Sequence, residues 1–445
     1  MAISGLEIYK LLPKTNCKEC GFPTCLAFAM QIAAKKASLD KCPYVSDDSK
    51  SKLASASRPP INLVTIGSGD DKLEIGNETV MFRHEETFYH PTGIGLLIED
   101  TSSESELKAK IEKIDRLRFE RVGQNISVDL IAIKNTSKDT KKFISAVKKA
   151  SEISKLGLVL ISDSPETLKA ALELTKERKP LIYPASMENL DQIAAMAKEA
   201  GCSIALKSDS LEGLSSLAEK ASSMSINNAM LDTGQKPLRK KIEDQIYLRR
   251  MALKKAYRPF GYPTITFTES EDPFEEAAEA ASLIAKYAGI VIMKNAESWN
   301  VMPLLTVRQN IYTDPQKPLQ VESKVYEVGN VTADSPVLIT TNFSLTYYTV
   351  ESEVESSKIP SYIVSVDSEG MSVLTAWAAD KFTPEKITAM LKDSGLENKI
   401  KNKELILPGY VAVMSGKLQE ESGWTVKVGP REASGIPSYL KGIIK

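Results

Sequence analysis

Eight short apolar runs alternate with amphipathic segments between residues 93 and 293, and this alternation constrains the fold more than any other feature of the sequence. Each run has the length of a buried β-strand, and the segments between runs repeat their apolar residues with helical spacing. Strands that are each followed by a helix form parallel β/α units, so eight units in series predict a closed (β/α)8 TIM barrel. The runs are Gly93–Glu99, Val128–Lys134, Leu156–Ser162, Pro180–Tyr183, Ser203–Lys207, Asn228–Leu231, Thr264–Thr268 and Gly289–Met293.

The stretches beside this series predict a domain on each side of the barrel. Asn62–Ile66 and Glu78–Arg83 indicate a β-hairpin before the barrel, and Trp299–Pro318 interrupts the alternation and is interpreted as a connector. Five further apolar runs, separated by helical stretches, predict an open α/β sheet of flavodoxin-like (Rossmann-like) type. These runs are Ser335–Thr340, Ser361–Asp367, Glu404–Leu407, Tyr410–Met414 and Thr425–Val428. The predicted domains are 1–57, 58–312 and 319–445.

Four of the five cysteines fall within 26 residues, as Cys17, Cys20, Cys25 and Cys42 with the spacing C-x2-C-x4-C-x16-C. Three thiols on a short loop with a remote fourth favour a 4Fe–4S cluster over a zinc site, which usually has two C-x2-4-C knuckles, and over unrelated thiols or disulfides. An Ala-rich helix over 26–37 would place Cys25 at a helix N-terminus, where the dipole favours a thiolate. So small a domain needs the metal centre to stabilise it. Cys202 stands alone and is interpreted as a small core residue.

Composition excludes several classes of partner. The chain has 57 basic and 58 acidic residues, so nothing indicates nucleic acid or an anionic membrane as a partner. No apolar run is long enough for a membrane span, and the N-terminus lacks a signal-peptide pattern, so a cytoplasmic location is predicted.

Several predicted barrel strands are followed by a polar residue at the end where barrel enzymes carry their active sites. These residues are Asp100, Asn135, Asp163, Asp232, Glu269 and Lys294. They also suit helix caps and turns, which is the simpler interpretation. The two histidines, His84 and His90, precede the barrel and are expected at a surface or interface.

The loops after the C-terminal strands are rich in Gly, Ser, Thr and Asn. None is a dinucleotide-binding or P-loop motif. Small neutral groups on closely approaching backbone suit a large, flat ligand rimmed with amides, such as a corrinoid; a plain docking domain is the alternative. Residues 311–445 contain no histidine, so no imidazole from this domain would ligate a bound cobalt.

The cysteine spacing, the barrel after it and the loops TTNFSLTYY, DSEGMSVLTAW and GPREASGIP together resemble the large (gamma) subunit of the corrinoid/iron–sulfur protein of the reductive acetyl-CoA pathway. The resemblance covers essentially the whole chain. It implies a 4Fe–4S cluster on the four clustered cysteines and a base-off, cobalamin-type corrinoid on the C-terminal domain. The implied corrinoid contacts are Thr340, Thr341, Asn342, Thr346, Gly370, Met371, Ser372, Val373, Gly416, Gly429, Pro430, Arg431, Ala433 and Gly435.

The resemblance also implies a function. The corrinoid cobalt would accept a methyl group from methyl-tetrahydrofolate through a separate methyltransferase and deliver it to acetyl-CoA synthase, and the cluster would reduce inactive Co(II) to Co(I). The implied partners are a smaller barrel subunit in a heterodimer, that methyltransferase, acetyl-CoA synthase, and a reductive activator or ferredoxin. The chain would be a methyl carrier, at most a corrinoid-dependent methyltransferase. Two alternatives stay open: a catalytic barrel methyltransferase using Asp100, Asp163 and Asp232, and a cluster-bearing docking subunit without corrinoid.

Overall fold

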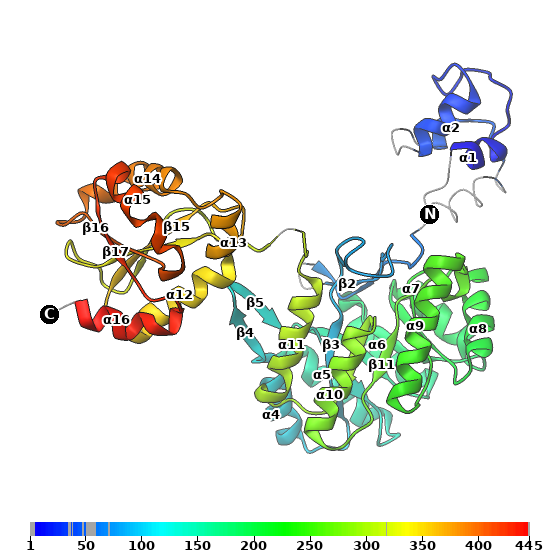
Figure 1. Cartoon of the computed structure of the whole chain (residues 1–445). Coiled ribbons are helices and arrows are strands. Elements are labelled where there is room, and N and C mark those ends of the chain that lie inside the picture. Colours follow the sequence, from blue (N-terminus) through cyan, green and yellow to red (C-terminus); the bar gives the residue numbers. More distant parts are fainter. Residues whose placement is uncertain are drawn as a thin grey trace. The chain divides into compact units, whose positions relative to one another are not determined.

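The computed structural model describes residues 5–33, 37, 39–46, 49, 59–69, 72–316 and 318–443. Contacts between Cα atoms divide the chain into two units, one of residues 1–118 and 127–312 and the other of residues 119–126 and 313–445 (Figure 1). The predicted boundary between residues 57 and 58 lies outside the described residues, and the three predicted domain ranges remain a prediction. Among the described helices, none is both long and apolar enough to cross a lipid bilayer.

The cysteine segment folds into two short helices, α1 (Gly5–Leu11) and α2 (Cys25–Ala33), followed by the 3-10 turn η1 (Leu39–Lys41). Its small core contains Ile8, Leu12 and Phe28 together with the thiols of Cys25 and Cys42. The helix predicted over 26–37 is present as α2, although residues 34–36 lie outside the description. With so few apolar side chains, this segment buries little surface of its own.

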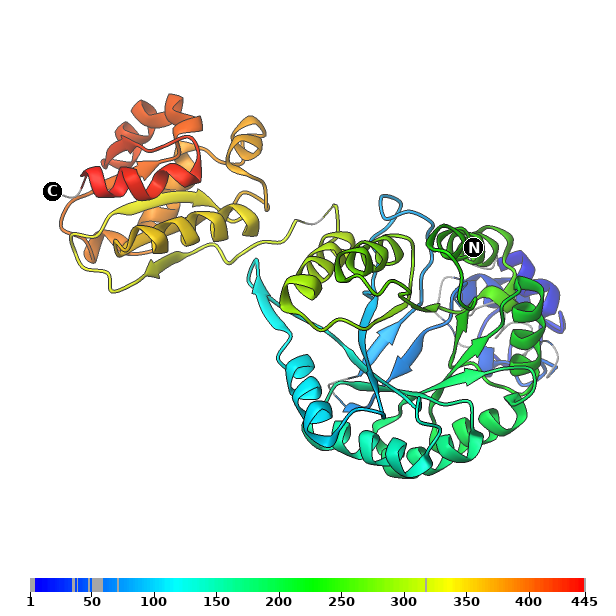
Figure 2. The ribbon, with the colours of Figure 1, turned by 90° about the horizontal axis from the view of Figure 1, so that it is seen from below.

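The central region is a barrel of parallel strands surrounded by helices (Figure 2). All eight predicted strands are confirmed, and they pair in the order β10-β9-β8-β7-β6-β3-β12-β11. A parallel bridge between Leu231 and Thr264 joins the two outer strands and closes the ring. The strands are β3 (Gly93–Glu99), β6 (Leu130–Lys134), β7 (Gly157–Ile161), β8 (Leu181–Ala185), β9 (Ser203–Lys207), β10 (Ala229–Asp232), β11 (Ile265–Phe267) and β12 (Ile290–Met293).

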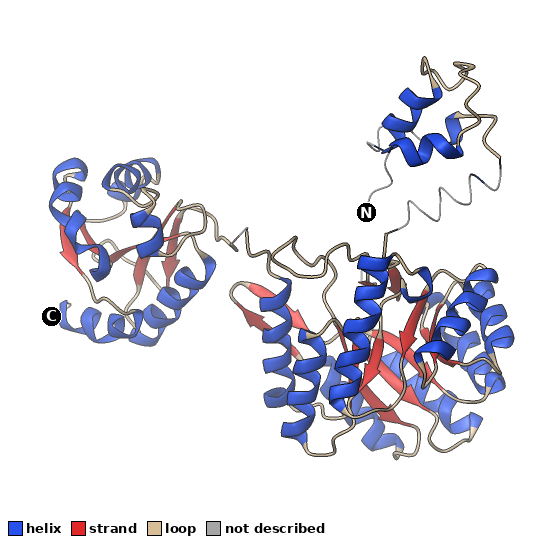
Figure 3. Cartoon of the chain, turned by 45° about the vertical axis from the view of Figure 1, so that its right-hand side comes forward, coloured by secondary structure: helices blue, strands red, loops and turns tan. Residues whose placement is uncertain are grey.

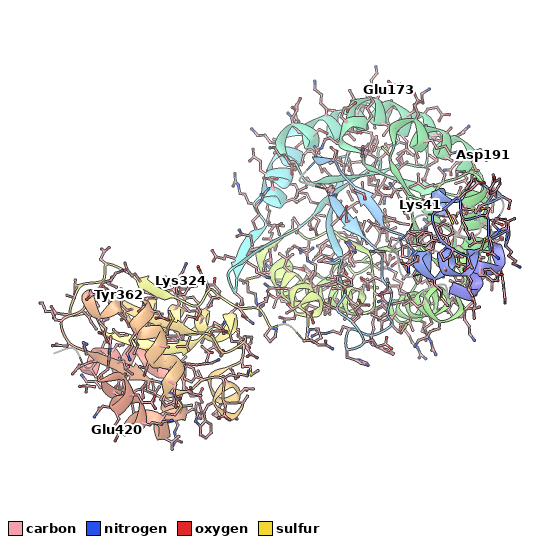
Figure 4. The ribbon with its side chains drawn as sticks, turned by 90° about the horizontal axis from the view of Figure 1, so that it is seen from above. Lys41, Glu173, Asp191, Lys324, Tyr362 and Glu420 are labelled. Carbon is pink, nitrogen blue, oxygen red and sulfur yellow. The ribbon has the colours of Figure 1, made fainter. Side chains whose placement is uncertain are left out.

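Helices form the outer layer of the barrel and carry their charged side chains outward, as Glu173 on α6 does in Figure 4. Side-chain caps begin several of them; the hydroxyl of Ser103, for example, accepts from the Glu106 N–H in a capping box. The helices are α4 (Glu104–Asp115), α5 (Thr140–Ile153), α6 (Pro165–Thr175), α7 (Leu190–Ala200), α8 (Leu211–Ser223), α9 (Leu238–Lys255), α10 (Pro273–Ala285) and α11 (Ser298–Tyr312), with 3-10 turns η3 (Lys176–Arg178) and η4 (Arg258–Phe260).

A hairpin of β1 (Val64–Ile66) and β2 (Leu73–Ile75) packs its apolar side chains into the barrel core at the amino ends of the strands. The prediction of a hairpin here is confirmed for its first strand, but Glu78–Arg83 as the second strand is wrong. That segment is held by a side chain instead of by strand pairing. The Arg249 guanidinium contacts the Glu78 carboxylate at 3.0 Å and donates to the Val80 carbonyl at 2.6 Å.

Two further predictions around the barrel are wrong. Trp299–Pro318 is not simply a connector, because α11 occupies most of it and buries Val301, Leu304 and Leu305. Pro303 and the mixed polarity obscured this helix, which tertiary packing stabilises. The helix predicted after β3 stops at Asp115, and the chain then forms an unpredicted hairpin of β4 (Arg118–Arg121) and β5 (Gln124–Ser127). Its turn residues Val122 and Gly123 both have positive φ, as a tight hairpin turn requires.

The C-terminal domain is a three-layer α/β/α sandwich whose sheet has the order β13-β15-β14-β16-β17 (Figure 3). Four strands are parallel and β13 pairs antiparallel at one edge, so the parallel part has the flavodoxin-like order 2-1-3-4. Side chains of β14 alternate between the two faces: Ile339 packs in one core with α14 and α15, and Leu338 packs in the other with α12 and α16. The elements are β13 (Val325–Val328), β14 (Val337–Thr341), α12 (Ser344–Ser357), β15 (Ser361–Val366), α13 (Val373–Ala378), α14 (Pro384–Asp393), η5 (Leu396–Asn398), β16 (Glu404–Leu407), η6 (Gly409–Met414), α15 (Ser415–Ser422), β17 (Thr425–Val428), η7 (Ala433–Gly435) and α16 (Ile436–Ile443).

One of the five strands predicted in this domain is wrong. Tyr410–Met414 forms the 3-10 segment η6 because it belongs to the connection from β16 to α15, where Gly409 donates to the Pro430 carbonyl at 3.0 Å and turns the chain away from the sheet. Strand β13 and helix α16 were not predicted.

Candidate cofactor sites

The cysteine segment places Cys25 at the first residue of α2, as predicted. Thr24 caps this helix by accepting from the Ala27 N–H at 3.0 Å. The Asn16 N–H donates to Cys25 Sγ at 3.4 Å, and the Asn16 side chain accepts from the Cys25 N–H at 2.8 Å. A peptide N–H directed at the sulfur and a helix N-terminus beneath it both stabilise a thiolate.

The loop before α2 has an unusual backbone. Lys14, Asn16 and Lys18 all have positive φ, although none is glycine. Such strain is concentrated at functional sites and persists only where the surroundings impose it. Here it surrounds Cys17, the most exposed of the four thiols and a predicted ligand position.

The four predicted metal ligands are all free thiols, and they differ in burial. Cys25 and Cys42 are buried in the core of the segment, Cys20 is partly buried and Cys17 is exposed. Within the described ranges, no three His, Cys, Asp or Glu side chains converge closely enough to hold a metal ion. The segment therefore brings Cys20, Cys25 and Cys42 to one small core and leaves Cys17 exposed, without gathering the sulfur atoms into a cage. The donor set, four soft thiols with one N–H···S bond, suits an iron–sulfur cluster.

The second predicted site lies at the carboxyl ends of the C-terminal strands. Strand β14 pairs in parallel with β15 on one side and with β16 on the other. The order in which strands are added to the sheet therefore reverses between β14 and β16, and open α/β sheets bind ligands at such a point. Thr340 and Thr341 end β14 at this point and are buried, and their hydroxyls have no hydrogen-bond partner among the described residues. Buried hydroxyls without partners are uncommon, and these two lie at the edge where the sequence predicts a ligand.

Asn342 follows β14 directly and organises the neighbouring loop. Its Oδ1 accepts from the Ser368 N–H at 3.0 Å, the Ser368 hydroxyl at 2.9 Å and the Gly370 N–H at 3.1 Å. Its Nδ2 donates to Gln320 at 3.2 Å and to Asp367 at 3.1 Å. The side chain is 3% exposed and fully engaged within the protein, so we assign Asn342 a positioning role for residues 367–371.

Glycines allow the loops after β16 and β17 to approach each other. A Cβ on Gly409 would lie 2.7 Å from the Gly429 carbonyl oxygen and 2.9 Å from the Arg431 nitrogen. Gly429 in turn donates to the Leu407 carbonyl at 2.8 Å. A Cβ on Gly435 would lie 2.8 Å from Pro430 Cβ. The backbone at this edge is therefore packed too closely for side chains, and Gly409 is a member of the site that the sequence did not single out.

The remaining predicted contacts surround this edge. Thr346 is half-buried near the start of α12, Ser372 occupies the N-cap position of α13 without a side-chain capping bond, and Gly416 lies in α15 with open space where its Cβ would be. A Cβ on Gly370 would instead meet the Gln320 side chain at 2.8 Å, and φ there is positive. Met371 and Val373 pack on the core, while Arg431 is exposed and Ala433 is half-buried.

Large apolar side chains are exposed on the same elements, and the sequence analysis missed them. They are Leu345, Leu374, Trp377, Tyr410, Val413 and Val428. Each lies at a carboxyl strand end or in the first turns after one. An apolar rim of this kind marks a ligand or protein contact. Apolar residues within loops otherwise rich in Gly, Ser and Thr were the signal available in the sequence.

The barrel groups proposed for the catalytic alternative are only partly brought together. Asp163 and Asp232 line one cavity at the carboxyl ends of the strands, but Asp100 is not part of that lining. Asp100 instead accepts from the N–H and the hydroxyl of Ser137, at 2.8 and 2.7 Å, and so holds the loop between β6 and α5; the next helix, α4, is capped by Ser103.

The histidines and the fifth cysteine have local structural contacts. His90 Nδ1 lies 2.8 Å from the Gly76 carbonyl oxygen, and the His84 ring stacks on Phe82. Cys202 is buried and its thiol contacts the Ala200 carbonyl. Burial raises the pKa of Cys202 to about 11, so this thiol is an unreactive core residue, as interpreted.

Comparisons with known proteins find matches to the cysteine segment and to the rest of the chain. A family model described as "CO dehydrogenase/acetyl-CoA synthase delta subunit" matches residues 63–440, and one described as "Putative Fe-S cluster" matches residues 12–44. The corrinoid/iron-sulfur protein large subunit of Moorella thermoacetica is 48% identical over 441 residues, which cover 99% of each chain. This chain belongs to the family of corrinoid/iron–sulfur protein large subunits.

An archaeal relative supports membership of this family. The acetyl-CoA decarbonylase/synthase complex subunit gamma of Methanothermobacter thermautotrophicus is 36% identical over 455 residues, again covering 99% of each chain. The longer family model is named after a delta subunit, but the full-length relatives are large or gamma subunits and include the cysteine segment. The predicted resemblance to the large-subunit family is thus confirmed. Among solved structures, dihydropteroate synthase from Thermus thermophilus aligns with 56% of this chain and 100% of its own, at 13% identity and a TM-score of 0.40.

Proposed function

We propose that this chain is the cofactor-bearing subunit of a methyl-group carrier in the acetyl-CoA pathway. A corrinoid on the C-terminal domain would take up a methyl group from methyl-tetrahydrofolate, through a separate methyltransferase, and release it to acetyl-CoA synthase. A 4Fe–4S cluster on Cys17, Cys20, Cys25 and Cys42 would supply the electron that reactivates the cobalt. Family membership supports the proposal.

The observation that carries the proposal is the neutral, apolar-rimmed edge of the C-terminal sheet in the same chain as the four-thiol segment. At this edge Thr340 and Thr341 offer buried hydroxyls, the loops at Gly409 and Gly429 expose backbone, and Val413 is 76% exposed. A flat macrocycle with amide side chains needs an apolar face and neutral hydrogen-bonding groups around it.

The protein's own residues would then hold the ligand without ligating its metal. Residues 311–445 contain no histidine, so no imidazole from this domain reaches the cobalt, and a base-off corrinoid is expected. Asn342 keeps the 367–371 loop in place through four hydrogen bonds, and a fifth joins it to Gln320. The exposed apolar rim would exclude water from the edge of the ring.

The partners follow from the same proposal. A smaller subunit would pair with this chain as a heterodimer, and the methyltransferase, acetyl-CoA synthase and a reductive activator or ferredoxin would dock in turn. On this proposal the chain itself carries the methyl group and catalyses neither transfer. The cytoplasmic location remains a prediction from the sequence.

Cys20→Ala tests the division of labour between the two sites. We expect the variant to lose the cluster and its activation through a reduced ferredoxin, while chemically reduced protein still takes up the methyl group. Metal analysis should give about four iron atoms and one cobalt per wild-type chain, and cobalt without the full iron complement in the variant. Cys202→Ala, which removes a core thiol outside the segment, should keep both metals. Loss of methyl uptake from Cys20→Ala with cobalt still bound would contradict the proposal.

A further inference from the structure

The barrel has a cavity of about 600 Å³ at the carboxyl ends of its strands. All eight strands contribute to its lining, either with their last residues or with the residue that follows. This volume is within the range of small-molecule sites, about 300–1,000 Å³, and is much larger than a gap that one or two water molecules fill.

The floor of the cavity is apolar and aromatic. Leu97 and Ile161 line it, and the rings of Tyr183 and Phe267 lie 5.1 Å apart. Beside them the Tyr183 hydroxyl donates to the buried Asp232 carboxylate at 2.6 Å, and the Gly234 N–H donates to the other carboxylate oxygen at 2.9 Å. The floor therefore suits the uncharged part of an organic ligand.

The walls carry five lysines, and two of them are neutralised by neighbouring carboxylates. Lys241 contacts Glu269 at 2.8 Å and Glu279 at 3.4 Å, and Lys294 pairs with Glu271. Within the part of the chain that the structure describes, the other three lysines have no ion-pair partner: Lys110, Lys134 and Lys207.

Two of these three lysines are not simply solvated surface groups. Lys110 is half-buried, and burial lowers its pKa; the charges of Glu99 and Glu276 oppose this shift only in part, and neither carboxylate forms an ion pair with Lys110. Lys207 is also half-buried and lies over the Tyr183 ring, 5.8 Å from its centroid. Unpaired cations inside a concave wall attract anions more strongly than the same charges on a convex surface.

One polar atom of the lining also lacks a partner. Asn135 follows β6 and donates to the Ser162 hydroxyl at 3.0 Å, but its buried Oδ1 has no hydrogen-bond partner among the described residues. That oxygen is fully buried and does not face the cavity, so Asn135 contributes to the wall only through its bond to Ser162.

We propose that the barrel mouth binds a small organic anion, a carboxylate or a phosphate ester. Lys110, Lys134 and Lys207 hold its acidic groups, and its uncharged part lies against the Tyr183 and Phe267 rings. Lys134 and Lys207 end strands three positions apart around the barrel, so the ligand extends across the mouth. The site is independent of both cofactors of the methyl-carrier proposal.

Pyridoxal 5′-phosphate is a suitable probe because it combines a phosphate with a flat ring and an aldehyde. The aldehyde condenses with a nearby lysine amine, releasing water, and borohydride reduces the resulting C=N bond to a stable amine. After limited labelling of the full-length chain, purified with any subunit that accompanies it, peptide mass mapping should find Lys110, Lys134 and Lys207 labelled at least about tenfold above Lys169. Lys169 is an exposed lysine on α6, away from the lining.

Citrate and glucose 6-phosphate distinguish the two ligand classes. Protection of the three lysines by either compound at low concentration supports the proposal and assigns a carboxylate or a phosphate. Equal labelling of the three lysines and Lys169, or labelling that neither compound reduces, would overturn it.

Variants separate binding from general damage to the fold. Lys207→Gln should reduce labelling of Lys110 and Lys134 by about fivefold, whereas Lys169→Gln should leave it unchanged. Glu99→Gln removes a carboxylate from the same wall and should increase labelling. Unfolding of the barrel alone cannot explain both a decrease in labelling in Lys207→Gln and an increase in Glu99→Gln. Thermal melting monitored by circular dichroism confirms that each variant is folded. If Lys207→Gln leaves the labelling unchanged, the three lysines do not share a ligand.

Discussion

The barrel and the C-terminal sheet both present the carboxyl ends of parallel strands, but the side chains at these two edges differ in chemistry. At the barrel mouth the strands end in ionisable groups such as Lys134, Lys207 and Asp232. At the sheet edge they end in Thr341, Asn342 and neighbouring glycines, with apolar side chains exposed around them. Topology determines where a site forms, and the side chains at the strand ends determine which ligand it suits.

The contrast is clearest in two buried residues of nearly the same shape. Asp232 ends β10 and only accepts hydrogen bonds, from Tyr183 and Gly234. Asn342 follows β14, and its amide both accepts and donates, which ties it to the loop after β15. The carboxylate of Asp232 adds a charge to the barrel mouth, whereas the amide of Asn342 adds none to the sheet edge and donates to the Asp367 carboxylate there. Replacing Asp232 with asparagine and Asn342 with aspartate should therefore change the stability of the protein in opposite directions.

Asn342→Asp should have the largest effect, a loss of about 3 kcal/mol in the stability of the C-terminal domain. The new carboxylate would still accept from Ser368 and Gly370. It would lose both donated hydrogen bonds and would face the Asp367 carboxylate at close range. Denaturant unfolding followed by the fluorescence of Trp377 and Trp424 would measure this loss, and corrinoid content should fall with it. Asn398→Asp, at an exposed position, should change stability by less than about 0.5 kcal/mol. Similar values for the two variants would contradict the positioning role of Asn342.

Asp232→Asn should stabilise the barrel by about 1 kcal/mol at neutral pH. Burial raises the pKa of Asp232, and the hydrogen bonds from Tyr183 and Gly234 only partly oppose this. Between the unfolded and the folded pKa the native carboxyl group binds a proton that the unfolded chain has lost. Stability therefore falls as pH rises from about 4 through the folded pKa, and the amide removes this dependence.

Measuring the free energy of unfolding of the full chain as a function of pH would test whether stability falls as the pH rises. The exposed Asp163 lines the same cavity, and Asp163→Asn should leave the pH profile of stability almost unchanged. Destabilisation of the barrel by Asp232→Asn at neutral pH would mean that the ionised carboxylate is structurally required, and the contrast with Asn342 would then fail.

The sequence predicted the barrel strands well because each is a self-contained apolar run, buried from all sides. The prediction of the four cysteines as ligands was equally local, since it depends only on their spacing in one short segment, and it remains a prediction. The failures came where tertiary contacts decide the structure. Residues 410–414 have the composition of a strand but follow a backbone held by Gly409 and Pro430, and residues 298–312 form a helix around Pro303 because neighbouring elements bury one face.

In the candidate sites, too, local sequence patterns could be predicted and tertiary contacts could not. The loops proposed for the corrinoid follow from the rule that ligands bind at carboxyl strand ends, and the structure places these loops at that edge of the sheet. The structural role of Asn342 and the close approach at Gly409 were not, because both depend on segments far apart in the chain. The pairing of barrel lysines was likewise hidden: Lys241 and Lys294 resemble Lys134 and Lys207 in sequence, and only their contacts distinguish them.

Gly416→Leu should have the smallest effect on stability and the sharpest effect on function. A Cβ at Gly416 meets nothing within 4 Å, and leucine favours a helix over glycine by up to about 1 kcal/mol, so α15 should be unchanged or slightly more stable. If Gly416 contacts the corrinoid, the added side chain occupies the ligand's space, and the purified protein should contain much less cobalt. Gly442→Leu is the matched control, because Gly442 lies in α16 with equally open surroundings and is not a predicted contact. Full cobalt content in both variants would remove α15 from the site and restrict the corrinoid to the loops around Thr341 and Gly429.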